Sequence, residues 1–105
     1  MRNRLGYVYV LTNNNNRVLY VGSSSNLVRR IKFHKKAYLR GFTRNYNVNK
    51  LVYYGVFPDI VSARRRERQI KGWRREKKIR LIESMNPKWM DLYNGLKGDP
   101  LLRWG

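Results

Sequence analysis

The hydrophobic positions near the N-terminus form two short runs, YVYVL and VLYV, separated by a polar stretch with four consecutive asparagines. Both runs are rich in β-branched and aromatic side chains, and this pattern predicts two strands joined in an antiparallel hairpin. Symmetrical pairing about the asparagines places Thr12 opposite Arg17, and therefore Tyr9 opposite Tyr20. We expect these two tyrosines to face each other across the strand pair.

A helix is predicted directly after the second run. One of the polar residues 24–26 can cap its first turn, and Leu27, Ile31 and Tyr38 then recur at helical spacing. After a turn-rich stretch, residues 51–57 read as a third strand that Pro58 closes. A three-stranded sheet is therefore the minimum core that the pattern predicts.

The second half of the chain is predicted to be helical and basic. Asp59 or Ser62 can begin a long helix that extends to residue 80, with Gly72 as a weak point inside it. Asn86 followed by Pro87 is typical of an N-cap and a first helical position, and predicts a short element there. The glycine-punctuated segment 94–105 is expected to be a loosely ordered C-terminal tail after a single domain at 1–93.

The charge of the chain points to a polyanionic partner. Its 24 Lys and Arg against 6 Asp and Glu give a net charge of +18, and residues 62–80 carry ten of the basic side chains. Nucleic acid is the first candidate and an anionic membrane surface the second. Binding to a membrane surface is the weaker hypothesis, because this basic stretch lacks a strongly hydrophobic helical face opposite its arginines.

Other composition features narrow the chemistry. The chain has no cysteine, which excludes disulfides, thiolate catalysis and zinc-finger or iron–sulfur sites. It also has no apolar run of membrane-spanning or signal length, so we expect a cytoplasmic location without membrane attachment. With so few carboxylates, a two-metal cluster is disfavoured, and one metal ion held by one protein carboxylate, water and phosphate is the most that the sequence readily offers.

Several side chains have both a structural and a functional interpretation. Glu67 falls inside the inward stripe of the long helix, where it can form an ion pair with Lys71 or a neighbouring arginine, or ligate a metal. Arg30 is either a phosphate anchor or a solvated charge. His34 is either a polar helix residue or a catalyst. Asn86 is either a cap or a site residue, and the strand tyrosines are either core or site residues.

Together these residues resemble the signature of the GIY-YIG nuclease superfamily, specifically its small single-domain bacterial members. Tyr20-Val21-Gly22 resembles the second signature triplet, and Tyr7-Val8-Tyr9 stands in place of the first, without its glycine. The resemblance covers roughly residues 5 to 93. It continues at family-like spacing through five further segments: Asn26–Ile31 with His34, Gly41–Thr43, Leu51–Tyr54, Arg66–Trp73 and Asn86–Trp89.

The resemblance implies an α/β (α+β) domain with a small three-stranded antiparallel sheet flanked by helices. It also implies a metal-dependent phosphodiester hydrolase that uses one Mg²⁺ or Mn²⁺. Carried onto matching positions, Tyr9 and Tyr20 would be the signature tyrosines, Arg30 and His34 the helix pair, Glu67 the metal ligand, and Asn86 the C-terminal asparagine. Tyr20 is the favoured base or water-positioner with Tyr9 as its partner, although the order could be reversed. A tight turn at Gly22 would let the backbone approach the phosphate.

The expected function is endonuclease cleavage of DNA in repair or recombination, structure-selective or weakly sequence-selective. This follows because no separate recognition segment is visible in the chain. The alternative is a non-catalytic basic module that binds DNA or RNA, supported by the charge and by the 14 aromatic residues. Neither the pattern nor the resemblance decides the oligomeric state.

Overall fold

The computed structural model describes residues 4–39 and 48–97. The elements run in the order β1 (Gly6–Thr12), β2 (Leu19–Ser24), α1 (Leu27–Leu39), β3 (Lys50–Phe57), α2 (Ile60–Lys71), α3 (Arg75–Met85) and α4 (Tyr93–Lys97). The predicted turn at 41–43 and residues 98–105 of the predicted tail lie outside the described residues. Within the described ranges, no helix is both long and apolar enough to cross a membrane.

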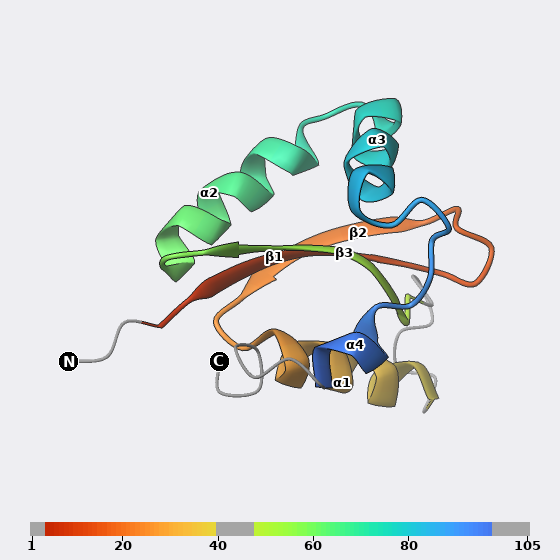
Figure 1. The fold of residues 1–105 in the computed structure, drawn as a ribbon, viewed down its shortest axis with the longest axis horizontal. Coiled ribbons are helices and arrows are strands. Elements are labelled where there is room, and N and C mark those ends of the chain that lie inside the picture. The colour runs from red at the N-terminus through yellow and green to blue at the C-terminus, as the bar shows by residue number, and fades with distance from the viewer. Residues whose placement is uncertain (1–3, 40–47, 98–105) are drawn as a thin grey trace.

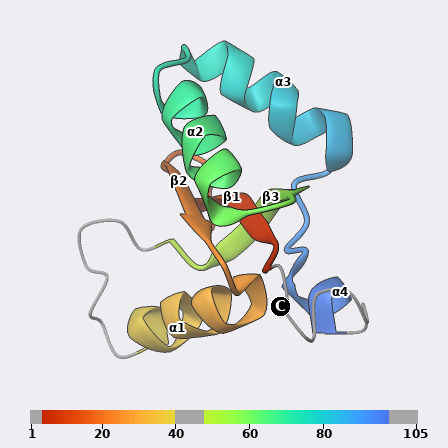
Figure 2. The same cartoon turned by 90° about the vertical axis from the view of Figure 1, so that its left-hand side faces the viewer.

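The three strands form one antiparallel sheet, which confirms the expected fold class, and their order in the sheet is β2-β1-β3. Helices α2 and α3 cover one face of this sheet, and α1 and α4 cover the other (Figure 1). In Figure 2 the chain leaves β2 and runs directly into the start of α1, while α2 lies on the opposite side of the sheet. The fold is therefore a three-layer α+β domain whose strand β2 is one of its two sheet edges.

The central strand β1 is buried along its whole length, which explains its unbroken apolar sequence. Tyr7, Tyr9 and Leu11 point toward α1 and α4, where they share a core with Leu27 and Ile31. The intervening valines of β1, Val8 and Val10, point the other way into a second core formed with α2 and α3. The buried residues of this second core are Val8, Val10, Val21, Val52, Ala63, Ile70 and Ile82. The domain thus has two cores, one on each face of the sheet.

The predicted register of the hairpin is wrong by two residues. Tyr20 lies opposite Leu11, and Tyr9 lies opposite Gly22. The cause is the loop, because the side-chain oxygen of Asn13 accepts hydrogen bonds from the backbone amides of residues 17 and 18 at 2.8 and 3.1 Å, which removes both from the strand ladder. A two-residue shift keeps every side chain on its face, so Tyr9 and Tyr20 still share one side of the sheet.

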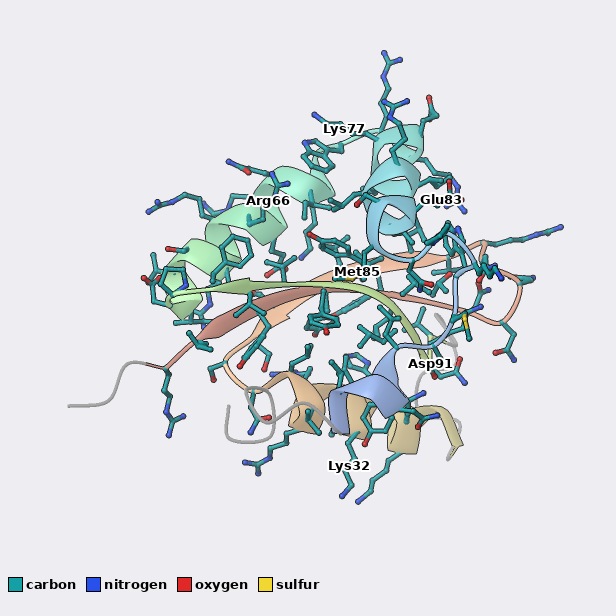
Figure 3. The ribbon with its side chains drawn as sticks, in the orientation of Figure 1. Lys32, Arg66, Lys77, Glu83, Met85 and Asp91 are labelled. Atoms are coloured by element: carbon teal, nitrogen blue, oxygen red, sulfur yellow. The ribbon has the colours of Figure 1, made fainter. Side chains whose placement is uncertain are left out.

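The single long helix predicted over 62–80 is also corrected, since the structure divides it into α2 and α3. Asp59 caps α2, as predicted, by accepting a hydrogen bond from the Ser62 amide at 2.7 Å. Gly72 ends α2, and its amide bonds back to the carbonyls of residues 69 and 70. In Figure 3, Arg66 on α2 and Lys77 on α3 both point away from the sheet. The predicted weak point is therefore the corner between two basic helices.

The sequence predicted that Asn86 begins a short helical element, and this prediction is wrong. Asn86 instead caps the C-terminal end of α3. Its side-chain amide donates to the Val52 carbonyl at 3.1 Å and to the Met90 carbonyl at 2.7 Å, and its oxygen accepts from the Met90 amide at 3.0 Å. Pro87 lies in a non-helical segment that follows the edge of β3, and the next helix, α4, begins only at Tyr93. Helix α4 then buries Leu96 against the first core.

Candidate active site

Two tyrosines and the histidine of the chain meet on the α1 face of the sheet. The ring centroids of Tyr9 and Tyr20 are 6.5 Å apart, and the imidazole of His34 lies 6.2 Å from the first and 5.5 Å from the second. Tyr9 comes from the central strand, Tyr20 from the edge strand, and His34 from the second turn of α1. These contacts bring His34 together with Tyr9 and Tyr20, three of the residues that the sequence analysis singled out.

Gly22 makes room for this cluster. It lies within β2, so the predicted turn at this position is wrong. A Cβ atom added at Gly22 would lie 2.5 Å from the Tyr9 hydroxyl and 2.6 Å from the ring carbon that carries it. Those separations are far below normal contact distances of about 3.5–4.0 Å. The glycine therefore allows the Tyr9 phenol to lie flat against the edge strand.

Tyr9 is poorly suited to lose its proton. Its side chain is only 2% exposed. Burial raises the pKa of Tyr9 well above its usual value, and the nearby Tyr20 and Glu67 raise it further, while Arg30 opposes them. A buried phenol that keeps its proton is a hydrogen-bond donor, so the chemistry that needs a base falls to another member of the cluster.

His34 is held in its neutral form. Burial lowers the pKa of His34, and the positive charge of Arg30 lowers it further. Its Nδ1 atom is buried and has no hydrogen-bond partner among the described residues. At neutral pH the imidazole is therefore available to accept or relay a proton rather than to act as a fixed positive charge.

Arg30 lies one helical turn before His34 and is exposed. The helix that carries it begins at Leu27. Asn26 caps its first turn, because the Asn26 side-chain oxygen accepts a hydrogen bond from the Arg29 amide at 3.1 Å. Arg30 also lines an open depression of about 400 Å³, together with Arg4, Ser24, Ser25, Asn26, Arg29 and Phe33. This end of β2 and α1 is therefore basic, open to solvent and next to the tyrosine–histidine cluster.

Glu67 approaches β2 from the other face of the sheet. One carboxylate oxygen accepts a short hydrogen bond from the Ser23 hydroxyl, and the other forms an ion pair with Lys71 at 2.6 Å. Burial alone would raise the pKa of Glu67, but the bonds from Lys71 and Ser23 and the charges of Lys71 and Arg64 outweigh it and lower the pKa below its usual value. Glu67 is therefore an anion whose position is fixed against the edge strand.

The two halves of the site meet at consecutive residues of β2. Ser23 points to the α2 face and bonds to Glu67, whereas Ser24 points to the α1 face and lines the basic depression beside Arg30. Side chains alternate in this way along any strand. Because β2 is an edge strand, its outer side is next to both faces of the sheet. The charge of Glu67 is the smallest of the effects that raise the pKa of Tyr9, after burial and Tyr20.

The residues around Glu67 fit one loosely coordinated divalent ion. No group of three or more Asp, Glu or His side chains is found in residues 4–39 and 48–97 that could hold a metal without help. One carboxylate and the Ser23 hydroxyl could supply two oxygen ligands, and Mg²⁺ ordinarily keeps several waters and binds substrate phosphate. Lys71 would have to release its carboxylate oxygen, and its side chain, 57% exposed, is free to move.

Asn86 is not brought together with the other predicted site residues. It bonds along β3, on the edge of the sheet opposite β2, and its side-chain amide is occupied by backbone groups. Two strand spacings of about 4.8 Å each separate those edges. Its part in catalysis stays a prediction, whereas its part in holding the segment 86–90 against β3 is directly visible.

Sequence reasoning missed Ser23, which ties Glu67 to the edge strand. The signal was present in the alternation of β2, because Tyr20 on one face implies that Ser23 points to the opposite face. This alternation would have linked Ser23 to Glu67 only if the position of α2 on that second face had been known. The role of Gly22 was missed for a similar reason, since it depends on the correct register with Tyr9.

Comparison with known proteins identifies the family of the chain. The family model described as the GIY-YIG catalytic domain matches residues 5–80. The chain is 37% identical to the UPF0213 protein CPE1444 of Clostridium perfringens over 84 residues, which cover 80% of this chain and 89% of that protein. It is 34% identical to the UPF0213 protein SH2523 of Staphylococcus haemolyticus over 77 residues, covering 73% and 93%. No solved structure matches the chain. The chain therefore belongs to the GIY-YIG family of nuclease-like catalytic domains.

Proposed function

We propose that this protein is a divalent-metal-dependent endonuclease that hydrolyses DNA phosphodiester bonds at the edge of β2. We further propose that it selects its substrate by structure, or only weakly by sequence, and acts in repair or recombination. The family supplies the nuclease-like character. The net charge of +18 supports a nucleic-acid substrate, because basic surfaces bind phosphates by releasing their counterions.

The observation that carries the proposal is that a basic site and a fixed carboxylate lie on opposite sides of two consecutive residues, Ser23 and Ser24. Arg30 and the tyrosine–histidine cluster lie on one side of this step, and the fixed anion of Glu67 lies on the other. A sugar–phosphate backbone crossing the strand edge would contact both sides. Phosphodiester hydrolysis needs such a combination, since negative charge builds on the phosphoryl oxygens and on the leaving oxygen.

The roles of the residues follow from their charge and burial. Arg30 binds the scissile phosphate and stabilises the charge that develops on it. Tyr9 stays protonated and donates a hydrogen bond, while the less buried Tyr20 orients the attacking water and passes on its proton. His34 is neutral and accepts that proton or relays it.

Glu67 and Ser23 would hold one Mg²⁺ or Mn²⁺, which when bound supplies charge neutralisation to the phosphate oxygens. Glu67 is prepared for this role because its pKa is lowered and it is ionised at neutral pH. In the reaction, water adds to phosphorus and the bond to the 3′ oxygen breaks, which leaves a 5′-phosphate and a 3′-hydroxyl that receives the displaced proton.

A panel of labelled substrates tests this proposal. Duplex, flap, branched and single-stranded DNA, and single-stranded RNA, are incubated with the protein in Mg²⁺, in Mn²⁺ and in EDTA. We expect metal-dependent cleavage of at least one DNA substrate, with a preference set by DNA structure rather than by base sequence. Absence of cleavage from every substrate would contradict the proposal, and a strict sequence requirement on linear duplex would contradict its selectivity.

A second candidate function is a non-catalytic DNA- or RNA-binding module. The Lys71–Glu67 ion pair favours it, because the carboxylate then has a structural partner and needs no metal. This candidate predicts tight, salt-dependent binding without cleavage. Lys71→Met separates the two functions: if Glu67 serves a metal, the variant still cleaves and needs less Mg²⁺, whereas a purely structural pair makes the variant less stable and leaves it inactive.

A further inference from the structure

Phe33 is the most exposed aromatic side chain in the described part of the chain, at 64% exposure. Helix α1 already places Leu27 and Ile31 in the core, so Phe33 is not needed to attach this helix to the sheet. An exposed phenylalanine loses the stabilisation that burial of its ring would give. Its exposed position is therefore notable.

The surroundings of Phe33 are basic. It lines the same depression of about 400 Å³ as Arg4, Arg29 and Arg30, a size within the range of about 300–1,000 Å³ found for ligand sites. Arg29 and Arg30 lie four and three residues before it, so all three side chains share one face of α1. Neither of the two ion pairs formed by the described residues involves these arginines.

The ring of Phe33 also touches the candidate active site. Its centroid lies 6.2 Å from that of His34, with the two planes at 82°. This edge contact holds the phenylalanine beside the imidazole and leaves most of its surface in solvent. A group stacked on Phe33 would therefore lie within one nucleotide step of a phosphate bound by Arg30.

We propose that Phe33 is a stacking platform for an unpaired nucleobase, with Arg4 and Arg29 holding the phosphates on either side of it. The inference deepens the proposed function, on which it rests for the location of the scissile phosphate. A flat aromatic surface between guanidinium groups is complementary to an unpaired nucleotide, since the ring meets the base and the cations meet the backbone.

Base pairing decides whether this platform can be used. In a duplex each base is stacked on its neighbours, so Phe33 could contact one only after the base is unstacked, which costs a few kcal/mol. A single strand, flap or frayed end presents its bases without that cost. Phe33 therefore directs the protein toward DNA that is unpaired next to the cleavage position.

Binding measured in EDTA tests the inference independently of cleavage. Fluorescence anisotropy gives the affinity of the parent, Phe33→Ala, Phe33→Trp and Val61→Ala for a short single strand, for the duplex of the same sequence, and for the single strand with abasic positions. Val61 is a matched control because it is 59% exposed at the start of α2 and does not line this depression. Circular dichroism melts compare the folding of the four proteins.

We expect Phe33→Ala to weaken single-strand binding by about 5- to 150-fold, the effect of losing one base–aromatic stacking contact. Duplex binding, which depends on phosphate contacts, should change by less than about twofold, with the same salt dependence in both proteins. Phe33→Trp should bind the single strand at least as tightly as the parent, and Val61→Ala should match the parent. On the abasic strand, the parent and Phe33→Ala should bind equally.

Three results would overturn the inference. Phe33→Ala could bind every DNA as the parent does. It could weaken single strand and duplex by the same factor, which would mean that Phe33 only shapes the arginine pocket. Its defect could persist on the abasic strand, which would place the contact elsewhere. A parent that binds as predicted but cleaves nothing in metal would refute the nuclease proposal and leave the binding result intact.

Discussion

Replacing Gly22 by alanine adds one methyl group at the position where β2 passes beneath Tyr9. The new Cβ would lie 2.5, 2.6 and 3.0 Å from three atoms of the Tyr9 phenol, so the ring must move by roughly 1 Å to reach normal contact distances. The ring has little room to move, because Tyr9 is 2% exposed and lies against Tyr20 and His34. The perturbation therefore acts on one buried side chain at the centre of the candidate site.

The expected magnitude follows from other overpacked cores. Inserting a methyl group into a filled space ordinarily costs about 1–3 kcal/mol of unfolding free energy. With a urea slope of about 1–3 kcal/mol per M, the midpoint of unfolding falls by about 1 M. Displacement of the Tyr9 hydroxyl removes its alignment with Tyr20, so cleavage should fall by at least about 10²-fold even where the variant is fully folded.

Urea denaturation followed by circular dichroism, and single-turnover cleavage at a temperature where each variant is folded, measure the two effects. Gly95→Ala is the matched control, because nothing lies within 4 Å of a Cβ atom at Gly95. It should be neutral, or more stable by up to about 1 kcal/mol, since alanine is the better helix former. In a Tyr9→Leu background the ring is absent, and Gly22→Ala should then cost less than about 0.5 kcal/mol.

Equal stability and equal cleavage rates for Gly22→Ala and the parent would refute this account of the glycine. A loss of stability that remains in the Tyr9→Leu background would also refute it, because the clash would then involve some group other than the phenol.

Three further predictions concern single side chains. Tyr20→Phe should lower the single-turnover rate by about 10²- to 10⁴-fold and Tyr9→Phe by less, because Tyr9 keeps its proton; rapid-quench cleavage of the two variants compares them, and the reverse order would exchange the two roles. The pKa of His34 in the folded protein lies below its usual 6.5, so the unfolded chain binds the proton more tightly and stability should fall as pH drops below about 6.5. In urea titrations at pH 7.5 and 5.5, His34→Asn should therefore lose less stability than the parent, and an equal loss would show that His34 is not responsible. Asn86→Ala leaves buried backbone groups without partners and should cost about 2–4 kcal/mol in a urea titration; a fully stable variant that no longer cleaves would instead make Asn86 a catalytic residue.

The sheet was predictable because each strand has a local signature. The β-branched and aromatic runs mark the strands, and asparagines and a proline mark their ends. The register was not predictable, since it depends on the side chain of Asn13 capturing two backbone amides that a symmetrical loop would leave in the ladder. Sequence periodicity carries no information about which of several asparagines does this.

The candidate site was predictable to the same degree. Helical spacing brings Arg30 and His34 together. Side chains two residues apart on a strand share one face, so Tyr20 and Gly22 stay on the same face as Tyr9 even though the predicted register was wrong by two residues. The contacts of Asn86 and Ser23 were not accessible, because each bonds to a residue more than 30 positions away. Such contacts depend on which helix covers which face of the sheet, and that is decided by packing over the whole domain.

The most direct test of a single-metal nuclease at the β2 edge is the single-turnover cleavage rate of Glu67→Ala at saturating DNA and Mg²⁺. Glu76→Ala serves as the control, because Glu76 is an exposed carboxylate on α3, away from Ser23. The account predicts that Glu67→Ala binds DNA in EDTA as tightly as the parent and cleaves it at least about 10²-fold more slowly, while Glu76→Ala matches the parent. Cleavage by Glu67→Ala at the parental rate would contradict it.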